Sequence, residues 1–402
     1  MDDAVMRPVV MKFGGSSVAD LERLRRVARR VVARAQERKV AVVVSAMGKT
    51  TNNLVAEACA LLDPPPAREL DMLMTTGERI SMALLAIAIA AEGRTAISLT
   101  GSQCGIITNH QAGRARIVEV RPFRVEDEWA EGHVVIVGGF AGVSYKREVT
   151  TLGRGGSDTT AVALAAALGA DCEIYSDVDG VYSGDPRELP AAQRIAALSY
   201  EEMQALSRAG AKVLHAQAVE LAEERGIAIY ARHSDPAIVG ETVIRTNPAR
   251  RSGVCAVTTD LVRDVEVALT ADDPELRARL RGEAAEAGLL YLRCDRGGLS
   301  GLLSTRRTDA SALARRFAGF AGVAGVARAA VSDERALVSC VGAGLEDRPE
   351  LFREAEEALA AAGIAVEALL TDARTLSVLV DAGQRAAAAA ALHARFIAGP
   401  PR

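Results

Sequence analysis

The chain has 402 residues, of which 49% are hydrophobic and 25% are charged, and its 48 basic and 52 acidic side chains leave a net charge of −4 at pH 7. This length is typical of about two or three domains, and the composition excludes a disordered chain, a collagen-like chain and a disulfide scaffold. A slightly acidic chain with only 3% aromatic residues is also poorly suited to binding a phosphate backbone or stacking on bases, so we expect no nucleic-acid partner.

The cysteines and the apolar runs indicate the compartment. The two nearest cysteines, Cys255 and Cys294, are 39 positions apart, which excludes a CxxC redox or zinc motif. The longest uncharged apolar run, Met82–Ala91, has ten residues, whereas a membrane span needs about 20. The first residues also lack a signal-peptide pattern. We therefore expect a cytoplasmic protein with reduced cysteines and no membrane association.

The first 250 residues alternate short β-branched runs with long Ala-, Leu- and Arg-rich stretches. The runs predict strands at Val9–Phe13, Val40–Val44, Ala96–Leu99, Val134–Val137, Glu173–Tyr175 and Ala228–Tyr230. The stretches predict helices at Ala19–Glu37, Gly77–Ala91, Asp158–Leu168, Ser199–Arg208 and Ala211–Arg225. Several runs are apolar throughout, which is typical of strands covered on both faces of a mainly parallel sheet. Ligands of such sheets bind at the carboxyl ends of the strands.

After about residue 250 the pattern changes to a β-α-β-β-α order that occurs twice. The first copy is predicted at Val265–Thr270, Pro274–Gly288, Leu289–Cys294, Leu299–Ser304 and Ser311–Phe317. The second is predicted at Leu337–Val341, Pro349–Ala361, Ile364–Leu370, Leu376–Val380 and Gln384–Phe396. The duplication predicts two small α+β ligand-binding or dimerisation domains at 251–328 and 329–402, after a first domain at 1–250.

Glycine-rich loops follow two of the predicted strands. Lys12 precedes Gly14-Gly15-Ser16-Ser17, and adjacent glycines before a helix let backbone N–H groups turn toward an anion. The same pattern also describes an ordinary tight turn with a solvent-exposed lysine. The loop Ser45–Thr51 contains Gly48-Lys49-Thr50 but has Val43 where a P-loop needs its first glycine. Ser45 and Thr51 remain as hydroxyls for a polar ligand.

The strongest loop signal is Gly153-Arg154-Gly155-Gly156-Ser157-Asp158. Ser157 or Asp158 is a good N-cap for the helix that follows. A cap does not explain the arginine among glycines, whereas a guanidinium beside a helix start suits bidentate capture of a carboxylate or phosphate.

Two further segments are compatible with ligand binding. The loop Ser176–Arg187 is rich in turn formers, but Asp177, Tyr182 and Arg187 exceed what a turn needs and would suit a nucleotide. Lys212 can be read as a solvated helix lysine, and Glu78 as an acid at a helix start, where the helix dipole alone would favour it.

These loops in this order closely resemble the aspartate kinases of the amino acid kinase family, over nearly all of residues 6–246. The resemblance implies a three-layer αβα sandwich with a mainly parallel sheet, followed by two ACT-like (βαββα) domains. It also implies transfer of the γ-phosphoryl group of ATP to the side-chain carboxylate of L-aspartate, with Mg²⁺ carried by ATP and no protein metal cage.

By resemblance, each loop takes a role. Lys12 stabilises the transferring phosphoryl group, Arg154 grips the α-carboxylate of the substrate, and Asp158 organises the polar site. Glu78 binds the substrate α-ammonium group, and Ser45, Thr51 and Ser157 add hydroxyl contacts. The residues assigned to the nucleotide are Lys12, Gly14, Gly15, Ser176, Asp177, Tyr182, Asp185, Arg187 and Lys212.

The resemblance leaves regulation and alternatives open. Each ACT helix of feedback-sensitive members tends to begin with Pro-Gly, but this chain has Pro274-Glu275 and Pro349-Glu350. Inhibition by lysine or threonine is therefore in doubt, whereas a homodimer through the ACT-like domains, or a higher oligomer, is expected. The pathway is that of lysine, threonine and methionine or a specialised one. The alternative functions are phosphorylation of another small amino acid, or non-catalytic sensing of a nucleotide or amino acid.

Overall fold

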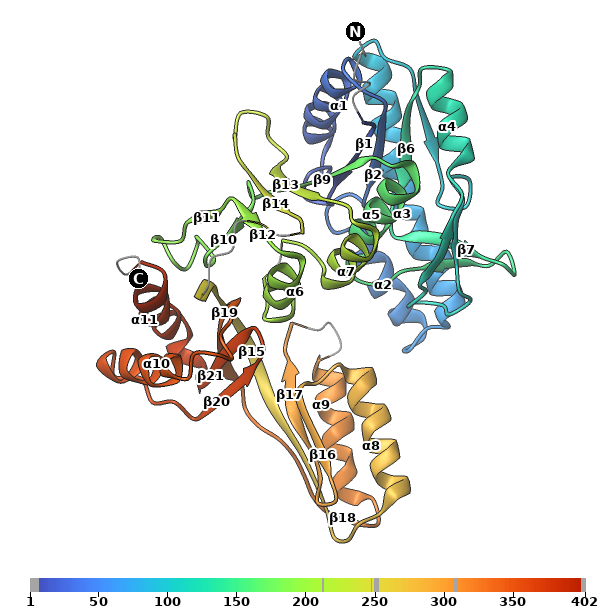
Figure 1. The fold of residues 1–402 in the computed structure, drawn as a ribbon. Helices are drawn as coiled ribbons and strands as arrows, with labels where there is room; N and C mark the ends of the chain where they lie inside the picture. The colour runs from blue at the N-terminus through green and yellow to red at the C-terminus, as the bar shows by residue number, and fades with distance from the viewer. Residues whose placement is uncertain (1–6, 212, 247, 249–252, 307–309, 399–402) are drawn as a thin grey trace. The chain divides into compact units, whose positions relative to one another are not determined.

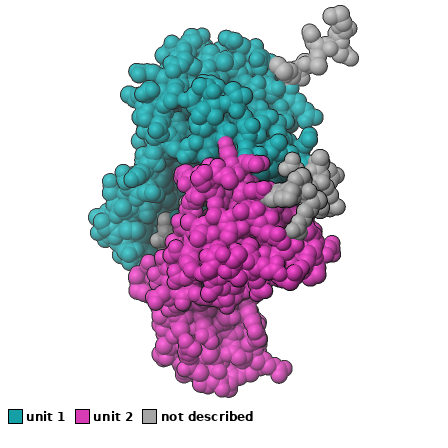
Figure 2. All heavy atoms as spheres, turned by 90° about the vertical axis from the view of Figure 1, so that its left-hand side faces the viewer, with its two compact units in different colours: residues 1–181, 194–207, 212–250 teal, residues 182–193, 208–211, 251–402 magenta. Residues whose placement is uncertain are grey.

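The structure is a computed structural model that describes residues 7–211, 213–246, 248, 253–306 and 310–398. The chain forms two compact units, which Figure 2 shows in separate colours. The first unit comprises residues 1–181, 194–207 and 212–250, and the second comprises 182–193, 208–211 and 251–402. Each unit has its own sheet and its own hydrophobic core.

The first unit contains an eight-stranded sheet in the order β12-β14-β13-β9-β1-β2-β6-β3 (Figure 1). The strands are β1 (Val9–Phe13), β2 (Val40–Val44), β3 (Ala96–Leu99), β6 (Val134–Gly138), β9 (Asp171–Ser176), β12 (Ala197–Leu198), β13 (Ile229–His233) and β14 (Glu241–Ile244). All neighbouring strands are parallel except β13 and β14. The predicted bounds of β1, β2 and β3 are confirmed to the residue, because each short run is interrupted at both ends by a proline, a glycine or a polar residue.

Helices cover both faces of this sheet. Alternate side chains of β1, β2 and β6 pack against α1 (Leu21–Ala35) and α3 (Ala67–Ala91) on one face. On the other, α5 (Gly156–Leu168) contacts β1, β2 and β9, and α7 (Ala216–Arg225) packs on α5. Although α3 is long and apolar enough to cross a membrane by length and composition, its packing on α1 and the sheet is that of a core helix.

The remaining elements of the first unit are α2, α4 and α6 and a second, four-stranded sheet in the order β5-β4-β7-β8. Their bounds are α2 (Thr50–Leu61), α4 (Phe123–Ala130), α6 (Tyr200–Arg208), β4 (Ile106–Thr108), β5 (Ile117–Val120), β7 (Ala141–Ser144) and β8 (Val149–Thr151). Two short strands, β10 (Val181–Tyr182) and β11 (Arg194–Ile195), lie at the unit boundaries. The second sheet, α2 and α4 were not predicted, because their short or weakly patterned sequences resemble loops.

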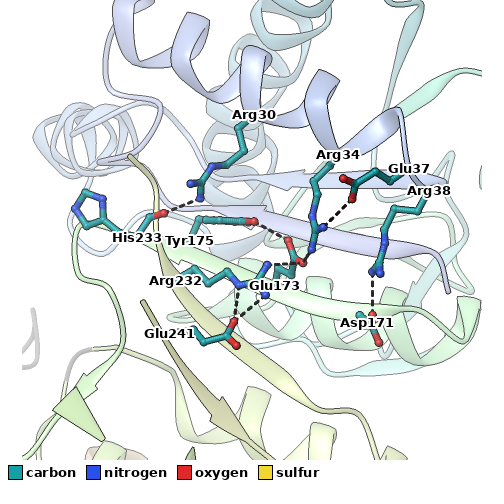
Figure 3. Close-up of polar contacts among 10 residues, drawn as sticks. All are labelled: Arg30, Arg34, Glu37, Arg38, Asp171, Glu173, Tyr175, Arg232, His233 and Glu241. Atoms are coloured by element: carbon teal, nitrogen blue, oxygen red, sulfur yellow. Dashed lines mark hydrogen bonds and ion pairs between the residues drawn. The ribbon is translucent and has the colours of Figure 1, made fainter. Parts of the chain in front are cut away.

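A buried ion-pair network joins α1 to β9 and β13 (Figure 3). Glu173 is almost fully buried and accepts hydrogen bonds from Arg34, Arg232 and the Tyr175 hydroxyl group. The Arg30 guanidinium lies 4.8 Å from the centre of the Tyr175 ring. Burial alone would raise the pKa of Glu173, but the hydrogen bond from Arg34 and the charge of Arg232 outweigh it, so the pKa is lowered. The carboxylate is therefore charged at neutral pH and fixes the three elements to one another.

In the second unit one long strand connects both predicted repeats. The sheet order is β16-β17-β15-β19-β21-β20, with β18 also paired to β15. Its elements are β15 (Gly253–Leu269), β16 (Leu290–Asp295), β17 (Gly298–Ser304), β18 (Val326–Val331), β19 (Arg335–Ala343), β20 (Ala368–Asp372), β21 (Thr375–Asp381), α8 (Pro274–Ala287), α9 (Ala310–Ala318), α10 (Glu350–Ala361) and α11 (Arg385–Phe396). The first half of β15 pairs with β19 and its second half with β17 and β18. The prediction of a strand starting at Val265 was wrong, because residues 253–264 continue the same extended pattern.

The helices of the second unit enclose two cores, one under α8 and α9 and one under α10 and α11. The segment 182–193 belongs to the second of these cores through the buried side chain of Leu189. Ser183 Oγ lies 2.9 Å from His393 Nε2 of α11, and Arg385 of the same helix donates to Glu188. A stretch from the middle of the sequence is thus an integral part of the C-terminal fold. The domain boundaries at 250/251 and 328/329 stay predictions.

Candidate active site

The carboxyl ends of β1, β2, β6 and β9 meet at one edge of the first sheet. The register pairs Phe13 at the end of β1 with Val44 of β2 and with Tyr175 of β9, and Val44 with Gly138 of β6. The loops that follow these strands are consequently neighbours, although they are far apart in sequence. This edge is where the sequence predicts ligand binding.

An ion pair connects the predicted loop around Lys12 with the predicted loop that contains Asp158. Lys12 Nζ, at the end of β1, lies 2.7 Å from Asp158 Oδ1 in the first turn of α5, and both side chains are largely buried. A Cβ atom on Gly14 would lie 3.5 Å from the Lys12 ammonium group, and one on Gly15 only 2.7 Å from the carbonyl oxygen of Ala46. Because the glycines carry no side chain, the ammonium group and the backbone of this loop remain close together.

The start of α5 differs from the prediction. The N-cap residue is Gly155, with a φ of +72°, and neither Ser157 nor Asp158 caps the helix. Ser157 Oγ instead accepts a hydrogen bond from Ser45 Oγ at 3.0 Å. The left-handed backbone at Gly155 frees both side chains of the first turn to face the ends of β1 and β2. The expected cap was wrong, but the residues it concerned lie at the candidate site.

Glu78 lies in the interior of α3 and not at a helix start. The sequence predicts that this helix starts at Gly77, but α3 begins ten residues earlier, at Ala67. A Cβ atom on Gly77 would lie 2.8 Å from the Ala46 Cβ atom, so glycine is required for close packing and does not end the helix. This approach brings Glu78 Oε1 to the backbone N–H of Ala46 at 3.1 Å, while its Oε2 has no partner among the described residues.

The electrostatic state of Glu78 is unusual. Burial raises its pKa to about 7, against the hydrogen bond from Ala46, which lowers it. A buried carboxyl group with one unpartnered oxygen has the chemistry to take up a proton or a cationic ligand.

Arg154 lies in the loop between two glycines with positive φ, Gly153 and Gly155. Its side chain is exposed and makes no hydrogen bond or ion pair with any residue that the structure describes. The ring of His215 packs on Gly155, where a Cβ atom would lie 2.2 Å from His215 Cγ. Burial lowers the pKa of His215 and the charge of Arg154 lowers it further, against the charge of Asp158. His215 is thus neutral at pH 7 and lies among the site residues.

His215 was not among the predicted site residues, although it ends the Gly210–His215 motif. The sequence does not reveal that the His215 ring packs on Gly155, and this contact is what places His215 beside the candidate site.

The predicted nucleotide residues fall into three groups. Ser176 and Asp177 follow β9 in the first unit, and exposed Asp177 lines a cavity of about 220 Å³ with Ser16, Ser17 and Arg23. Tyr182, Asp185 and Arg187 belong to the second unit, where the Arg187 guanidinium donates two hydrogen bonds to Asp185 and the Arg187 backbone N–H donates a third. Lys212 lies outside the described residues. Thr51 lies in the first turn of α2, with a partly exposed side chain.

The described residues contain one group of three potential metal ligands within reach of one ion: Glu128, Glu131 and His133. This group directly precedes β6, at the edge of the sheet opposite to the site, and Glu128 already accepts a hydrogen bond from Arg124. At the candidate site itself, the Asp158 carboxylate is paired with Lys12. The donor set there fits an Mg²⁺ ion that is held by phosphate oxygens and water rather than by a protein cage.

Several known proteins are similar to this chain in sequence and in fold. A model of the amino acid kinase family matches residues 7–232, and an ACT domain model matches residues 338–396. The chain therefore belongs to the amino acid kinase family. Its relatives include the aspartokinase of Corynebacterium glutamicum, 41% identical over 98% of this chain and 97% of that protein. The aspartokinase of Thermus thermophilus is 38% identical over 97% of this chain and 99% of that protein. Within the family, these relatives place the chain among the aspartokinases.

A solved structure confirms the fold. Aspartokinase III of E. coli, in complex with aspartate and ADP, superimposes with a TM-score of 0.80 at 24% identity, covering 96% of this chain and 99% of that one. The predicted family and the predicted αβα fold with a C-terminal ACT domain are confirmed.

Proposed function

We propose that the sheet edge formed by β1, β2, β6 and β9 is the active site of an ATP-dependent aspartate kinase, and that the chain converts L-aspartate to 4-phospho-L-aspartate. The observation that carries the proposal is the Lys12–Asp158 ion pair of 2.7 Å beside the Gly14-Gly15 loop. The first unit also offers the buried acid Glu78, whose Oε2 has no partner among the described residues, and the exposed Arg154, whose side chain pairs with none of them. Together they offer an anion cradle and a pair of opposite charges for an α-amino acid.

The reaction needs little acid–base chemistry from the protein. The substrate carboxylate has an ordinary pKa of about 4 and is already a nucleophile at neutral pH. One of its oxygens forms a bond to the γ-phosphorus of ATP while the bond from that phosphorus to the β,γ-bridging oxygen breaks, and ADP leaves with the electron pair. Positioning and cancellation of negative charge are what the site must supply.

The roles of the residues follow from their charges. Lys12 stabilises the transferring phosphoryl group, and Gly14 and Gly15, which carry no side chain, let the loop backbone come close to it. Asp158 holds the Lys12 ammonium group in place. Arg154 binds the α-carboxylate and Glu78 the α-ammonium group of aspartate, while Ser45, Thr51 and Ser157 add hydroxyl contacts.

For the nucleotide, Ser176 and Asp177 are the candidate contacts that the first unit offers, in the loop after β9. Tyr182, Asp185, Arg187 and Lys212 are assigned to the nucleotide by the family resemblance alone. Mg²⁺, when bound with ATP, supplies charge neutralisation on the phosphates. Aspartokinase III of E. coli was solved with ADP and aspartate, which are the product nucleotide and the amino-acid substrate of this reaction.

We propose a cytoplasmic homodimer that forms through the ACT-like domains. We further propose that neither lysine nor threonine binds at the start of α8 in the first ACT-like domain. The side chain of Asp273 accepts hydrogen bonds from the N–H groups of Glu275 and Leu276 at the start of α8. These N–H groups are therefore already satisfied and are not available to an effector carboxylate. Calorimetric titration with lysine and with threonine tests this, and tight binding of either would contradict it.

A hydroxylamine-trapping assay with ATP, Mg²⁺ and a panel of amino acids tests the function. Aspartate should yield the hydroxamate of an acyl phosphate, and the other amino acids should not. Turnover of a different amino acid alone would favour the first alternative function. ATP binding without any acyl phosphate would favour the sensor.

A further inference from the structure

A buried acid outside the proposed catalytic set ties the Arg154 loop to helix α3. Asp71 has no exposed surface and lies in the second turn of α3. Its Oδ2 accepts hydrogen bonds from the backbone N–H groups of Gly113, at 2.9 Å, and of Thr151, at 3.1 Å. Its Oδ1 accepts a third from the Thr151 hydroxyl group at 2.6 Å. Among the described residues no lysine, arginine or histidine forms an ion pair with Asp71. Its carboxylate oxygens accept hydrogen bonds only from the segments that contain Gly113 and Thr151 among these residues.

The two segments that Asp71 binds, at Gly113 and Thr151, lie next to the loop that carries Arg154. Thr151 is the last residue of β8, three positions before Arg154. Its carbonyl oxygen accepts from Ala115 N at 2.9 Å, and the next residue, Leu152, donates to Phe140 O. Gly153 in turn lies against the carbonyl oxygen of Gly113, 3.5 Å from the position of a Cβ atom. The left-handed glycines at 153 and 155 give the loop freedom, and Asp71 fixes the point from which it starts.

The same helix carries Glu78. Seven residues of α-helix are about two turns, so Asp71 and Glu78 share one face and stand about 10 Å apart along the axis. One rigid element therefore holds the proposed α-ammonium ligand and the anchor of the loop that bears the proposed α-carboxylate ligand. The distance between the two groups of the site that grip an α-amino acid is set by α3.

We propose that Asp71 is a positioning residue for substrate binding: through Thr151 it sets where Arg154 meets the α-carboxylate. This inference rests on the proposed function. Asp71 touches no reacting atom, so its loss should weaken aspartate binding and leave the nucleotide and the chemical step nearly unchanged.

The test uses the full chain and four single variants: Asp71→Asn, Thr151→Val, Thr151→Ser and Arg154→Ala. Thr151→Val removes one hydroxyl group from a buried site at constant shape, so the KM for aspartate should rise by about threefold to tenfold, with kcat and the KM for ATP changing less than about twofold. Asp71→Asn keeps a carbonyl oxygen for the two N–H donors but loses the negative charge that strengthens all three hydrogen bonds, and should raise the KM for aspartate by about threefold to tenfold. Thr151→Ser restores the hydroxyl group and should return the KM to within about twofold of wild type.

A double-mutant cycle separates positioning from plain structural support. If Thr151 acts through Arg154, then Thr151→Val should have no further effect on the aspartate KM once Arg154 is alanine. An unchanged aspartate KM in Thr151→Val, or an effect of equal size in the Arg154→Ala background, overturns the proposal. If Asp71→Asn fails to fold, the Thr151 pair and the cycle still decide the matter. Failure of the proposed function would be seen differently, as absence of acyl phosphate in the wild-type chain.

Discussion

Replacing Glu78 by glutamine should make the first unit more stable at alkaline pH. The folded-state pKa of Glu78 is about 7, against an ordinary value of 4.5. The difference of about 2.5, at about 1.4 kcal/mol for each pKa unit, amounts to about 3 kcal/mol. Because the pKa is raised on folding, the folded chain binds more protons between these two values, and its stability falls as pH rises through that window. Glutamine keeps the hydrogen bond from Ala46 but cannot ionise, so the variant escapes this loss.

The assay is denaturant unfolding at a series of pH values from about 5 to 8. The chain has one tryptophan, Trp129, which is buried in the first unit, so its fluorescence reports on the unit that contains Glu78. The gain in unfolding free energy of Glu78→Gln over wild type should grow by about 2 to 3 kcal/mol across this range. Glu57→Gln, which changes an exposed acid of α2, is the control and should show no such growth. A gain that is independent of pH would refute the reasoning.

Three further predictions concern charges described above. Lys12→Ala should lower kcat by more than about a hundredfold and leave ATP binding largely intact; an unchanged kcat would remove Lys12 from the mechanism. Arg154→Ala should raise the aspartate KM by more than about tenfold without lowering the melting temperature, since the exposed guanidinium has no partner among the described residues; a shift below about threefold would contradict its role. Glu173→Gln should destabilise the first unit by about 3 to 5 kcal/mol, because Arg34 and Arg232 lose their buried anion. Since the pKa of Glu173 is lowered, this loss of stability should persist at neutral pH and shrink only as the pH falls below the ordinary carboxyl range. Unfolding curves of both proteins at acid pH check this, and a difference in stability that does not shrink there would contradict the prediction.

The central strands could be predicted because burial on both faces demands uninterrupted β-branched runs, as at Val40–Val44. The position of Lys12 and Gly14 at the carboxyl edge of the sheet followed from the rule that ligands bind where parallel strands end. That rule does not place Arg154, because its loop follows β8 of the second, four-stranded sheet. Helix bounds were harder. Gly77 is a packing glycine inside α3 and not a breaker, because it contacts Ala46 from a distant part of the chain.

Other features depend on partners that a sequence does not reveal. Asp71 is one acid in a run with no motif, and only the fold shows that it caps Gly113 and Thr151. The lowered pKa of His215 is caused mainly by its burial, and its ring packs on Gly155. The length of β15 likewise reflects pairing with β19, a strand more than 70 residues further on in the chain.

The membership of residues 182–193 in the C-terminal unit bears on where this protein can be divided. A polypeptide cut after residue 250 would keep Leu189 but lose the apolar side chains that enclose it, and Ser183 and Glu188 would lose His393 and Arg385. Such a truncated protein would display an unsupported apolar stretch in the very loop that carries Tyr182, Asp185 and Arg187. Residues 251–402 therefore cannot be removed without exposing part of the remaining chain. Resistance of residues 182–193 to proteases would depend on helix α11, which lies almost 200 positions further along the sequence.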